Sequence, residues 1–252
     1  MIKPLVKILA TMASLFVLGV AVVAPASADV TLKMHMSMDN PMMRNMTPEM
    51  KTMMDKYMNM TEYYGLKKVR VDSFMVSIIT DLSAKQMIMA NNMNRKYAVT
   101  PLDEAKVKAM MNGNGKSMGM PSVDKTDQKI VDTGNTRTIL GHKCHEYIVT
   151  TTINTQGQVM TTNSDIFSAT DLGMDNPYAD AQGDLKVSGI PLLIKTSITG
   201  GMGAGTTVTL EATDVSTDSI PASTFQAPDG YTLTDQANLF GGMGGMMNPP
   251  MH

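Results

Sequence analysis

Three side chains in the middle of the chain have the chemistry to bind a metal ion. His142, Cys144 and His145 lie close together, and Cys144 is the only cysteine in the sequence. Alternate residues of a strand share a face, so His142 and Cys144 can converge while His145 points to the other face. Two ligands make half of a tetrahedral zinc site, and no second Cys and His cluster supplies the rest. We therefore interpret Cys144 as a small buried thiol in a packed strand.

The methionines offer a second kind of chemistry, because the chain contains 28 of them. A thioether is a soft ligand for Cu(I) or Ag(I), and the same flexible side chain also fills irregular apolar space. The candidate metal ligands follow one another over a predicted strand and the loop after it: Met34, Met36, Met38, Met42, Met43 and Met46. A further group of methionines and a histidine ends the chain. Composition alone leaves metal binding and cavity lining both open.

Catalytic motifs are absent from the sequence. It contains neither the G-x-S-x-G of a nucleophile elbow nor the H-E-x-x-H of a metalloprotease. Gly115-Lys116-Ser117 resembles the end of a phosphate-binding loop, but Met110 stands where that motif needs its first glycine. The sequence therefore predicts a protein that is not an enzyme and has no cofactor.

Residues 1–28 have the pattern of a secretory signal peptide. Lys3 and Lys7 precede the apolar run Ile8 to Val23, and Ala26-Ser27-Ala28 is a small-residue cleavage signal. The apolar run is short for a transmembrane anchor. We expect an exported protein of the periplasm, or a secreted one, with no transmembrane anchor in the mature chain.

The charge balance argues against a nucleic-acid partner. The whole chain carries a formal charge of −2 at pH 7, and the loss of Lys3 and Lys7 with the leader makes the mature chain more acidic. Nucleic-acid binding calls for a basic surface. A single cysteine also excludes an intramolecular disulfide, so the fold depends on its core.

A strand and a helix position the methionines near the mature N-terminus. Residues 31–39 alternate apolar and polar side chains, which is the period of a strand with one apolar face. Thr47-Pro48 is typical of a helix start, and apolar residues then recur at helical spacing as far as Met58. We expect one apolar ligand cavity between this strand and this helix. Its predicted lining is Leu32, Met34, Met36, Met38, Met50, Met54 and Met58.

Short strands dominate the rest of the chain. Period-two segments between Met60 and Thr100 predict a meander, and a short helix is expected from Pro101 to about Met111. The stretch 136–152 predicts a strand near the centre of the sheet, and later strands are expected up to residue 215. We place one domain at residues 29–235. The Gly- and Met-rich residues 236–252 are expected to be a disordered tail.

Three segments carry a resemblance to a known family. Ile139 to Val149 (ILGHKCHEYIV), Ser188 to Thr196 (SGIPLLIKT) and above all Phe225 to Tyr231 (FQAPDGY) resemble the signatures of DUF4412, a family of exported bacterial proteins of unknown function. The resemblance spans roughly Val30 to Tyr231. It is specific in pattern and uninformative in chemistry.

The resemblance implies a fold similar to that of the periplasmic lipoprotein carriers and outer-membrane lipoprotein receptors. The expected fold class is mainly β (α+β), with a curved antiparallel half-barrel sheet and one or two covering helices. The expected function is binding of an apolar or amphiphilic ligand, such as a lipid or acyl chain, on the concave face. A Met-rich copper- or silver-binding protein is the alternative, and an envelope-assembly module without a small ligand is the third.

Overall fold

The computed structural model of this protein describes residues 29–40, 46–102, 125–155, 158–174, 187–200 and 204–240. Within these ranges, the side chains at positions 50, 51, 53, 54, 56, 125, 126, 155, 158 and 237 lie outside the description. The predicted leader, Met42, Met43 and the last part of the predicted tail also lie outside the described residues. Of the helix expected from Pro101 to about Met111 only Pro101 and Leu102 are described, and the predicted start is wrong because Pro101 lies in a strand.

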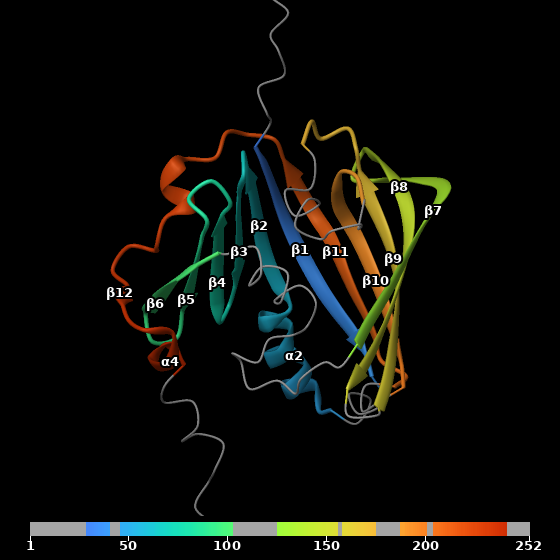
Figure 1. The fold of residues 1–252 in the computed structure, drawn as a ribbon, viewed down its shortest axis with the longest axis horizontal. Helices are drawn as coiled ribbons and strands as arrows, with labels where there is room; N and C mark the ends of the chain where they lie inside the picture. Colours follow the sequence, from blue (N-terminus) through green and yellow to red (C-terminus); the bar gives the residue numbers. More distant parts are fainter. Residues whose placement is uncertain are drawn as a thin grey trace, which may run out of the picture.

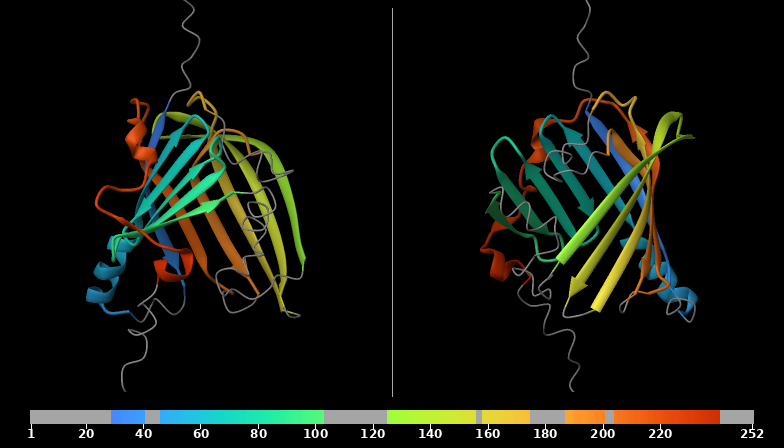
Figure 2. Two further views of the ribbon diagram at one scale, coloured as in Figure 1. Left: turned by 60° about the vertical axis from the view of Figure 1, so that its left-hand side comes forward. Right: turned by 45° about the vertical axis from the view of Figure 1, so that its right-hand side comes forward.

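The described strands form one large sheet, which confirms the mainly β class. In chain order they are β1 (Val30–Asp39), β2 (Asn59–Gly65), β3 (Lys68–Ser73), β4 (Val76–Asp81), β5 (Gln86–Asn91), β6 (Lys96–Pro101), β7 (Lys125–Ile139), β8 (His142–Thr155), β9 (Gln158–Ala169), β10 (Ile190–Thr199), β11 (Thr207–Ser216) and β12 (Thr232–Leu233). The order across the sheet is β12-β6-β5-β4-β3-β2-β1-β11-β10-β9-β8-β7. The sheet is curved and unclosed, with β12 and β7 as its edges (Figures 1 and 2).

The first strand of the domain lies in the middle of the sheet, although the sequence places it at one end of the chain. β1 pairs with β2 on one side and with β11 on the other, both antiparallel. The prediction of a central strand at 136–152 is wrong in position, because β8 is next to last and β7 is the edge. The local β-pattern of that stretch is correct. β1 pairs with β11, so the two ends of the domain lie together at the centre of the sheet and β8 lies near one edge.

Tight turns connect the strands as the sequence predicts. Leu140 and Gly141 join β7 to β8 and both have a positive φ, 49° and 87° respectively. This backbone geometry suits a two-residue hairpin, since its twist matches that of the flanking strands. Lys67, Lys85 and Arg95 also have positive φ values in the turns between β2 and β6.

The predicted helix after Thr47-Pro48 is confirmed as α2 (Pro48–Tyr57). Proline is favoured at the first helical position because its missing N–H has no intrahelical partner there. At the other end of α2, Tyr57 meets Phe74 edge-on, with 4.9 Å between the ring centroids. Phe74 lies in the connection from β3 to β4, so α2 sits at that end of the short strands (Figure 1).

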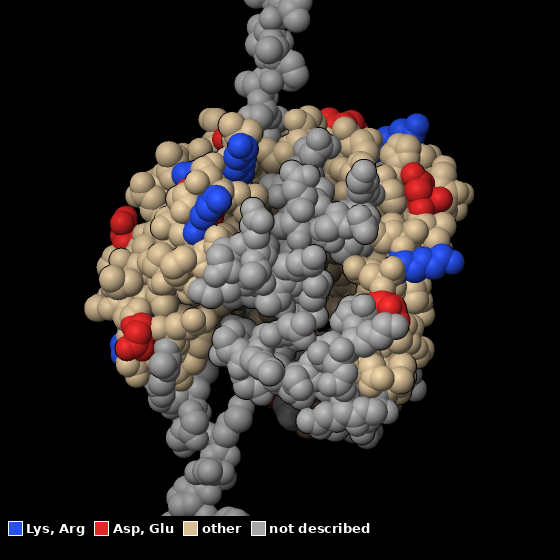
Figure 3. All heavy atoms as spheres, viewed as in Figure 1, with Lys and Arg blue, Asp and Glu red and all other residues tan. Residues whose placement is uncertain are grey.

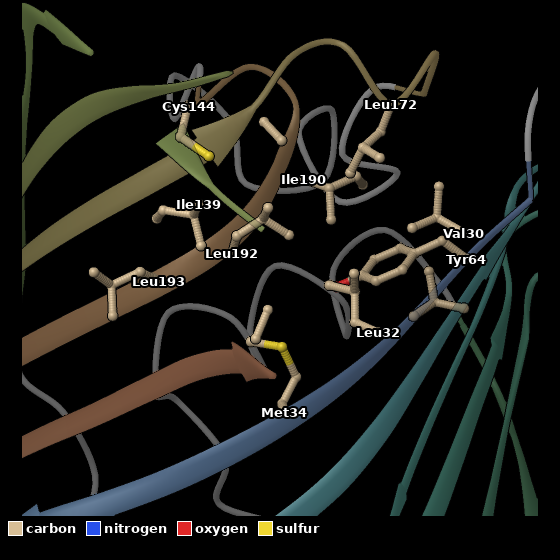
Figure 4. Close-up of a cluster of buried hydrophobic side chains, with 13 residues drawn as sticks. Val30, Leu32, Met34, Tyr64, Ile139, Cys144, Leu172, Ile190, Leu192 and Leu193 are labelled. Atoms are coloured by element: carbon tan, nitrogen blue, oxygen red, sulfur yellow. The ribbon is translucent and has the colours of Figure 1, made fainter. Parts of the chain in front are cut away.

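The main core lies on the concave face of the sheet. Val30, Leu32 and Met34 of β1 are buried and point toward residues of other strands, among them Tyr64 and Leu192 (Figure 4). Strands on both sides of β1 contribute to this cluster, so the curvature of the sheet brings their side chains together.

The segment around Phe225 covers the convex face of the short strands. We call residues 221–240 the C-terminal strap. Phe225, at the end of the 3₁₀ helix η4 (Ala222–Phe225), packs against Ile79 and Ile88. Arg70 donates a hydrogen bond to the carbonyl of Thr224 at 2.7 Å. These contacts fasten the strap to the sheet.

The strap then passes around the sheet edge and ends on the concave face. β12 pairs with β6 in parallel, and α4 (Gln236–Leu239) follows (Figure 1). Leu239 is fully buried against Met87 and Met89, and its carbonyl accepts a hydrogen bond from Asn91. Leu239 therefore belongs to the core, although it follows the predicted domain end at residue 235.

Candidate functional site

The candidate site is the concave face around β1. Leu32, Met34, Met36 and Met38 lie on one face of this strand, as the alternation predicts. Leu32 and Met34 are buried, whereas Met36 and Met38 remain partly exposed. A β-bulge opposite Met34 leaves Thr213 of β11 unpaired in the ladder, and the Thr213 hydroxyl donates to the carbonyl of Lys33 at 3.1 Å. The strand therefore passes from a packed core to a more open surface.

The helix residues of the predicted lining are only partly placed. The side chains of Met50 and Met54 lie outside the described residues, so their role stays a prediction. Met58 follows α2 directly, is partly buried, and its carbonyl accepts a hydrogen bond from the Met36 N–H at 2.7 Å. This backbone hydrogen bond places Met58 beside Met36, and a shared lining stays a prediction.

One row of apolar side chains crosses the sheet from β1 through β11, β10 and β9 to β8. Residues that are register partners on neighbouring strands point to the same side of the sheet. The apolar row runs from β1 to β8 through Met36, Leu210, Ile194, Ile166 and Tyr147. Tyr147 is buried and the others are partly exposed. Sequence reasoning identified only Met36, since strand order decides which residues align.

The next row on the same face mixes apolar and hydroxyl side chains. It runs through Met38, Val208, Thr196, Ser164 and Val149. The hydroxyls of Ser164 and Thr196 are hydrogen-bonded to each other at 2.8 Å. The concave face therefore changes from apolar to amphipathic toward one end of the long strands.

A carboxyl group stands on the apolar part of this face. Glu62 of β2 faces Leu32 of β1 on one side and Val71 of β3 on the other. The Tyr64 hydroxyl donates a hydrogen bond to Glu62 Oε2 at 2.5 Å. Burial raises the pKa of the Glu62 carboxyl, and the hydrogen bond from Tyr64 opposes that rise. Sequence reasoning missed Glu62; its position between Met60 and Tyr64 in a period-two segment was the available signal.

Four methionines occupy neighbouring positions where β1 meets β2. Met34 lies directly opposite Met60, and Met36 is hydrogen-bonded through its backbone to Met58. Of the predicted metal ligands, Met42 and Met43 lie outside the described residues, and Met46 is partly buried. The structure describes four of the predicted metal ligands, Met34, Met36, Met38 and Met46. Met58 and Met60, which the metal prediction did not include, lie next to Met36 and Met34.

Cys144 occupies a buried position, as the packed-thiol interpretation requires. Burial, together with the nearby Asp171 carboxylate, raises the pKa of the Cys144 thiol to about 11. Nδ1 of His142 lies 3.2 Å from Asp171. Among the residues that the structure describes, no group of three or more His, Cys, Asp or Glu side chains could hold a metal ion.

On the face drawn in Figure 3, charged side chains of both signs are scattered. In the view of Figure 3, lysines, arginines, aspartates and glutamates are interspersed and no extended basic patch is visible. In the described ranges, no helix is both long enough and apolar enough to cross a membrane.

The sequence matches the model of one protein family over most of its length. The family is described as a domain of unknown function (DUF4412), and the match covers residues 31–231. This chain belongs to the DUF4412 family. The DUF4412 match contains β1 from Thr31 onward, the apolar row, Glu62 and the segment around Phe225, so the candidate site and the start of the strap lie inside the family domain. No curated protein matches the chain in sequence.

Proposed function

We propose that this DUF4412 protein is a non-enzymatic binding protein of the bacterial periplasm, exported by its N-terminal leader. Its ligand is apolar or amphiphilic, such as a lipid or an acyl chain, and lies on the concave face of the sheet. The proposal includes the likeness to the lipoprotein-carrier half-barrel, with α2 as a covering helix and Met50 and Met54 among the contacts.

The observation that carries the proposal is the apolar row. Its members come from strands far apart in the chain, yet register places them side by side on one face. Met36, Leu210, Ile194 and Ile166 stay partly exposed, whereas Leu32, Met34 and Leu192 are buried. Exposed apolar surface of this kind is typical of a ligand site, and flexible methionines suit chains of varied shape.

Native mass spectrometry of the protein isolated from periplasm, without detergent, tests the proposal. We expect added mass that disappears after extraction with organic solvent. Met36→Asp places a charge in the apolar row and should abolish this added mass. Ser37→Asp is the matched control, because Ser37 is exposed on the opposite face of β1. Unchanged ligand content in a folded Met36→Asp protein would contradict the proposal.

A second candidate function, Cu(I) or Ag(I) binding, is favoured by the four methionines at the junction of β1 and β2. Replacing Met34, Met36, Met58 and Met60 with leucine preserves apolar volume and removes the thioethers. Loss of Cu(I) binding in this variant, measured by titration under reducing conditions, would support the metal function. Cu(I) binding that persists would exclude this group as its site.

A further inference from the structure

Glu62 is a charged residue type in surroundings that do not suit a charge. Leu32 and Val71 face it from the neighbouring strands, and Met60 and Tyr64 flank it on its own face of β2. Leu32 is fully buried in the concave cluster, and Figure 4 shows Leu32 and the Tyr64 ring lying side by side in that cluster. A carboxylate without a partner in such a place loses much of its hydration.

The described partner of the Glu62 carboxyl is a hydrogen-bond donor and not a cation. Tyr64 donates to Oε2, and among the described residues no Lys, Arg or His forms an ion pair with this carboxyl. The neighbouring strands show the contrast, since Asp72 is paired with Arg70 at 2.8 Å and Asp81 with Lys68 at 3.1 Å. The raised pKa of Glu62 agrees with a carboxyl that lacks a positive partner.

We propose that Glu62, oriented by Tyr64, anchors the head group of the ligand, and that this ligand is an amphiphile with a protonated amine. This inference rests on the function proposed above and narrows its ligand class. An ammonium group supplies the missing positive charge and three N–H donors. From Glu62, the alkyl chain can follow the partly exposed Met60 and Met58 to Met36, where the apolar row begins.

Charge complementarity is what selects the amine over other head groups. A fatty acid would bring a second negative charge to Glu62, and like charges at short distance repel each other. A fatty alcohol could donate one hydrogen bond and would leave the carboxylate charge unpaired. Ligands with the same chain and different heads therefore separate the contribution of Glu62 from that of the apolar face.

Calorimetric titration of the delipidated, exported chain with dodecylamine, dodecanol and dodecanoate tests this inference. We expect dodecylamine to bind most tightly. Glu62→Gln should weaken dodecylamine by about thirty-fold or more, because the ammonium loses its charge partner, and leave dodecanol nearly unchanged. Tyr64→Phe retains the carboxyl and should weaken dodecylamine by less. Glu211→Gln, at an exposed acid of β11, is the matched control and should have no effect.

The possible results separate this inference from the function on which it rests. Equal affinity for all three ligands, or a preference for the amine that survives in folded Glu62→Gln, would overturn the role of Glu62 in head-group binding. Binding of the alkyl chain on the concave face would remain supported. Absence of binding by any of the three ligands would overturn both proposals. An amine preference that Glu62→Gln removes and Glu211→Gln retains is the outcome we expect.

Discussion

The two halves of the sheet are stabilised in different ways. The half formed by β2–β6 has strands of six or seven residues, whereas β7–β11 has strands of 10 to 15 residues. The C-terminal strap packs on both faces of the short-strand half, through Phe225 on the convex face and Leu239 on the concave face. The long-strand half has longer ladders of backbone hydrogen bonds and carries most of the apolar row.

The two halves differ in how much of their surface they leave open. Short strands bury little area of their own, so both of their faces need the strap. Longer strands pair over more residues and can leave part of the concave face uncovered. Glu62 lies in the short-strand half, next to β1, where the packed core meets the candidate site.

The largest expected effect concerns the thiol of Cys144, which reports on the long-strand half. A pKa of about 11 leaves roughly a thousandth of the thiol ionised at pH 8, against about a quarter in an unfolded chain. Alkylation of the folded protein should therefore be at least about a hundred-fold slower than in urea. Comparable rates in both conditions would show that β8 is not packed as described.

The strap prediction tests whether the short-strand half depends on Phe225. Phe225→Ala removes a buried ring from the convex face and should lower the free energy of unfolding by about 3–5 kcal/mol, measured in urea. Leu233→Ala is the control, because Leu233 is 60% exposed in the same strap. Its effect should stay within about 0.5 kcal/mol.

Amide hydrogen exchange of Phe225→Ala shows whether the variant loosens only the short-strand half. We expect faster amide exchange in β3–β6 and slow alkylation of Cys144, because the long strands do not contact Phe225. Equal loss of protection in both halves would show that the sheet opens as one unit, and the comparison would fail.

Gly65 provides a smaller change at the same contact. A Cβ atom at this position would lie 2.9 Å from Cζ of Phe225, so Gly65→Ala forces the ring to move. We expect a loss of about 1–3 kcal/mol in the free energy of unfolding. In a Phe225→Leu background the penalty should shrink, since the two positions are coupled. Additive losses in the double variant would contradict the contact.

The smallest effect is the pH dependence of stability that Glu62 creates. Because its pKa is raised in the folded state, folding favours the protonated carboxyl, so stability decreases as pH rises above the unfolded pKa of about 4.3. Glu62→Gln should therefore be more stable than the natural protein at pH 8, and the difference should vanish below pH 4. Thermal melts at both pH values measure this. A less stable Glu62→Gln at pH 8 would indicate a cationic partner for Glu62.

The short-range features of this fold were predictable because they depend on neighbouring residues. Alternation along 31–39 predicts β1 and its apolar face, and Thr47-Pro48 predicts the start of α2. The meander of short strands follows from the period-two segments between Met60 and Thr100. Only the part of the candidate site that lies on β1 was predictable, because alternation identifies the residues on one face of a single strand.

Tertiary structure alone decided the rest, because strand order and register join residues far apart in the chain. Pairing of β1 with β11 places Met36 beside Leu210 and starts the apolar row. Pairing of β2 with β1 and β3 gives Glu62 apolar neighbours on both sides. Leu239 looks like part of a tail in sequence, and only its packing under β5 makes it core. A local pattern fixes which residues share a face of one strand, whereas the partners on that face depend on contacts between distant segments.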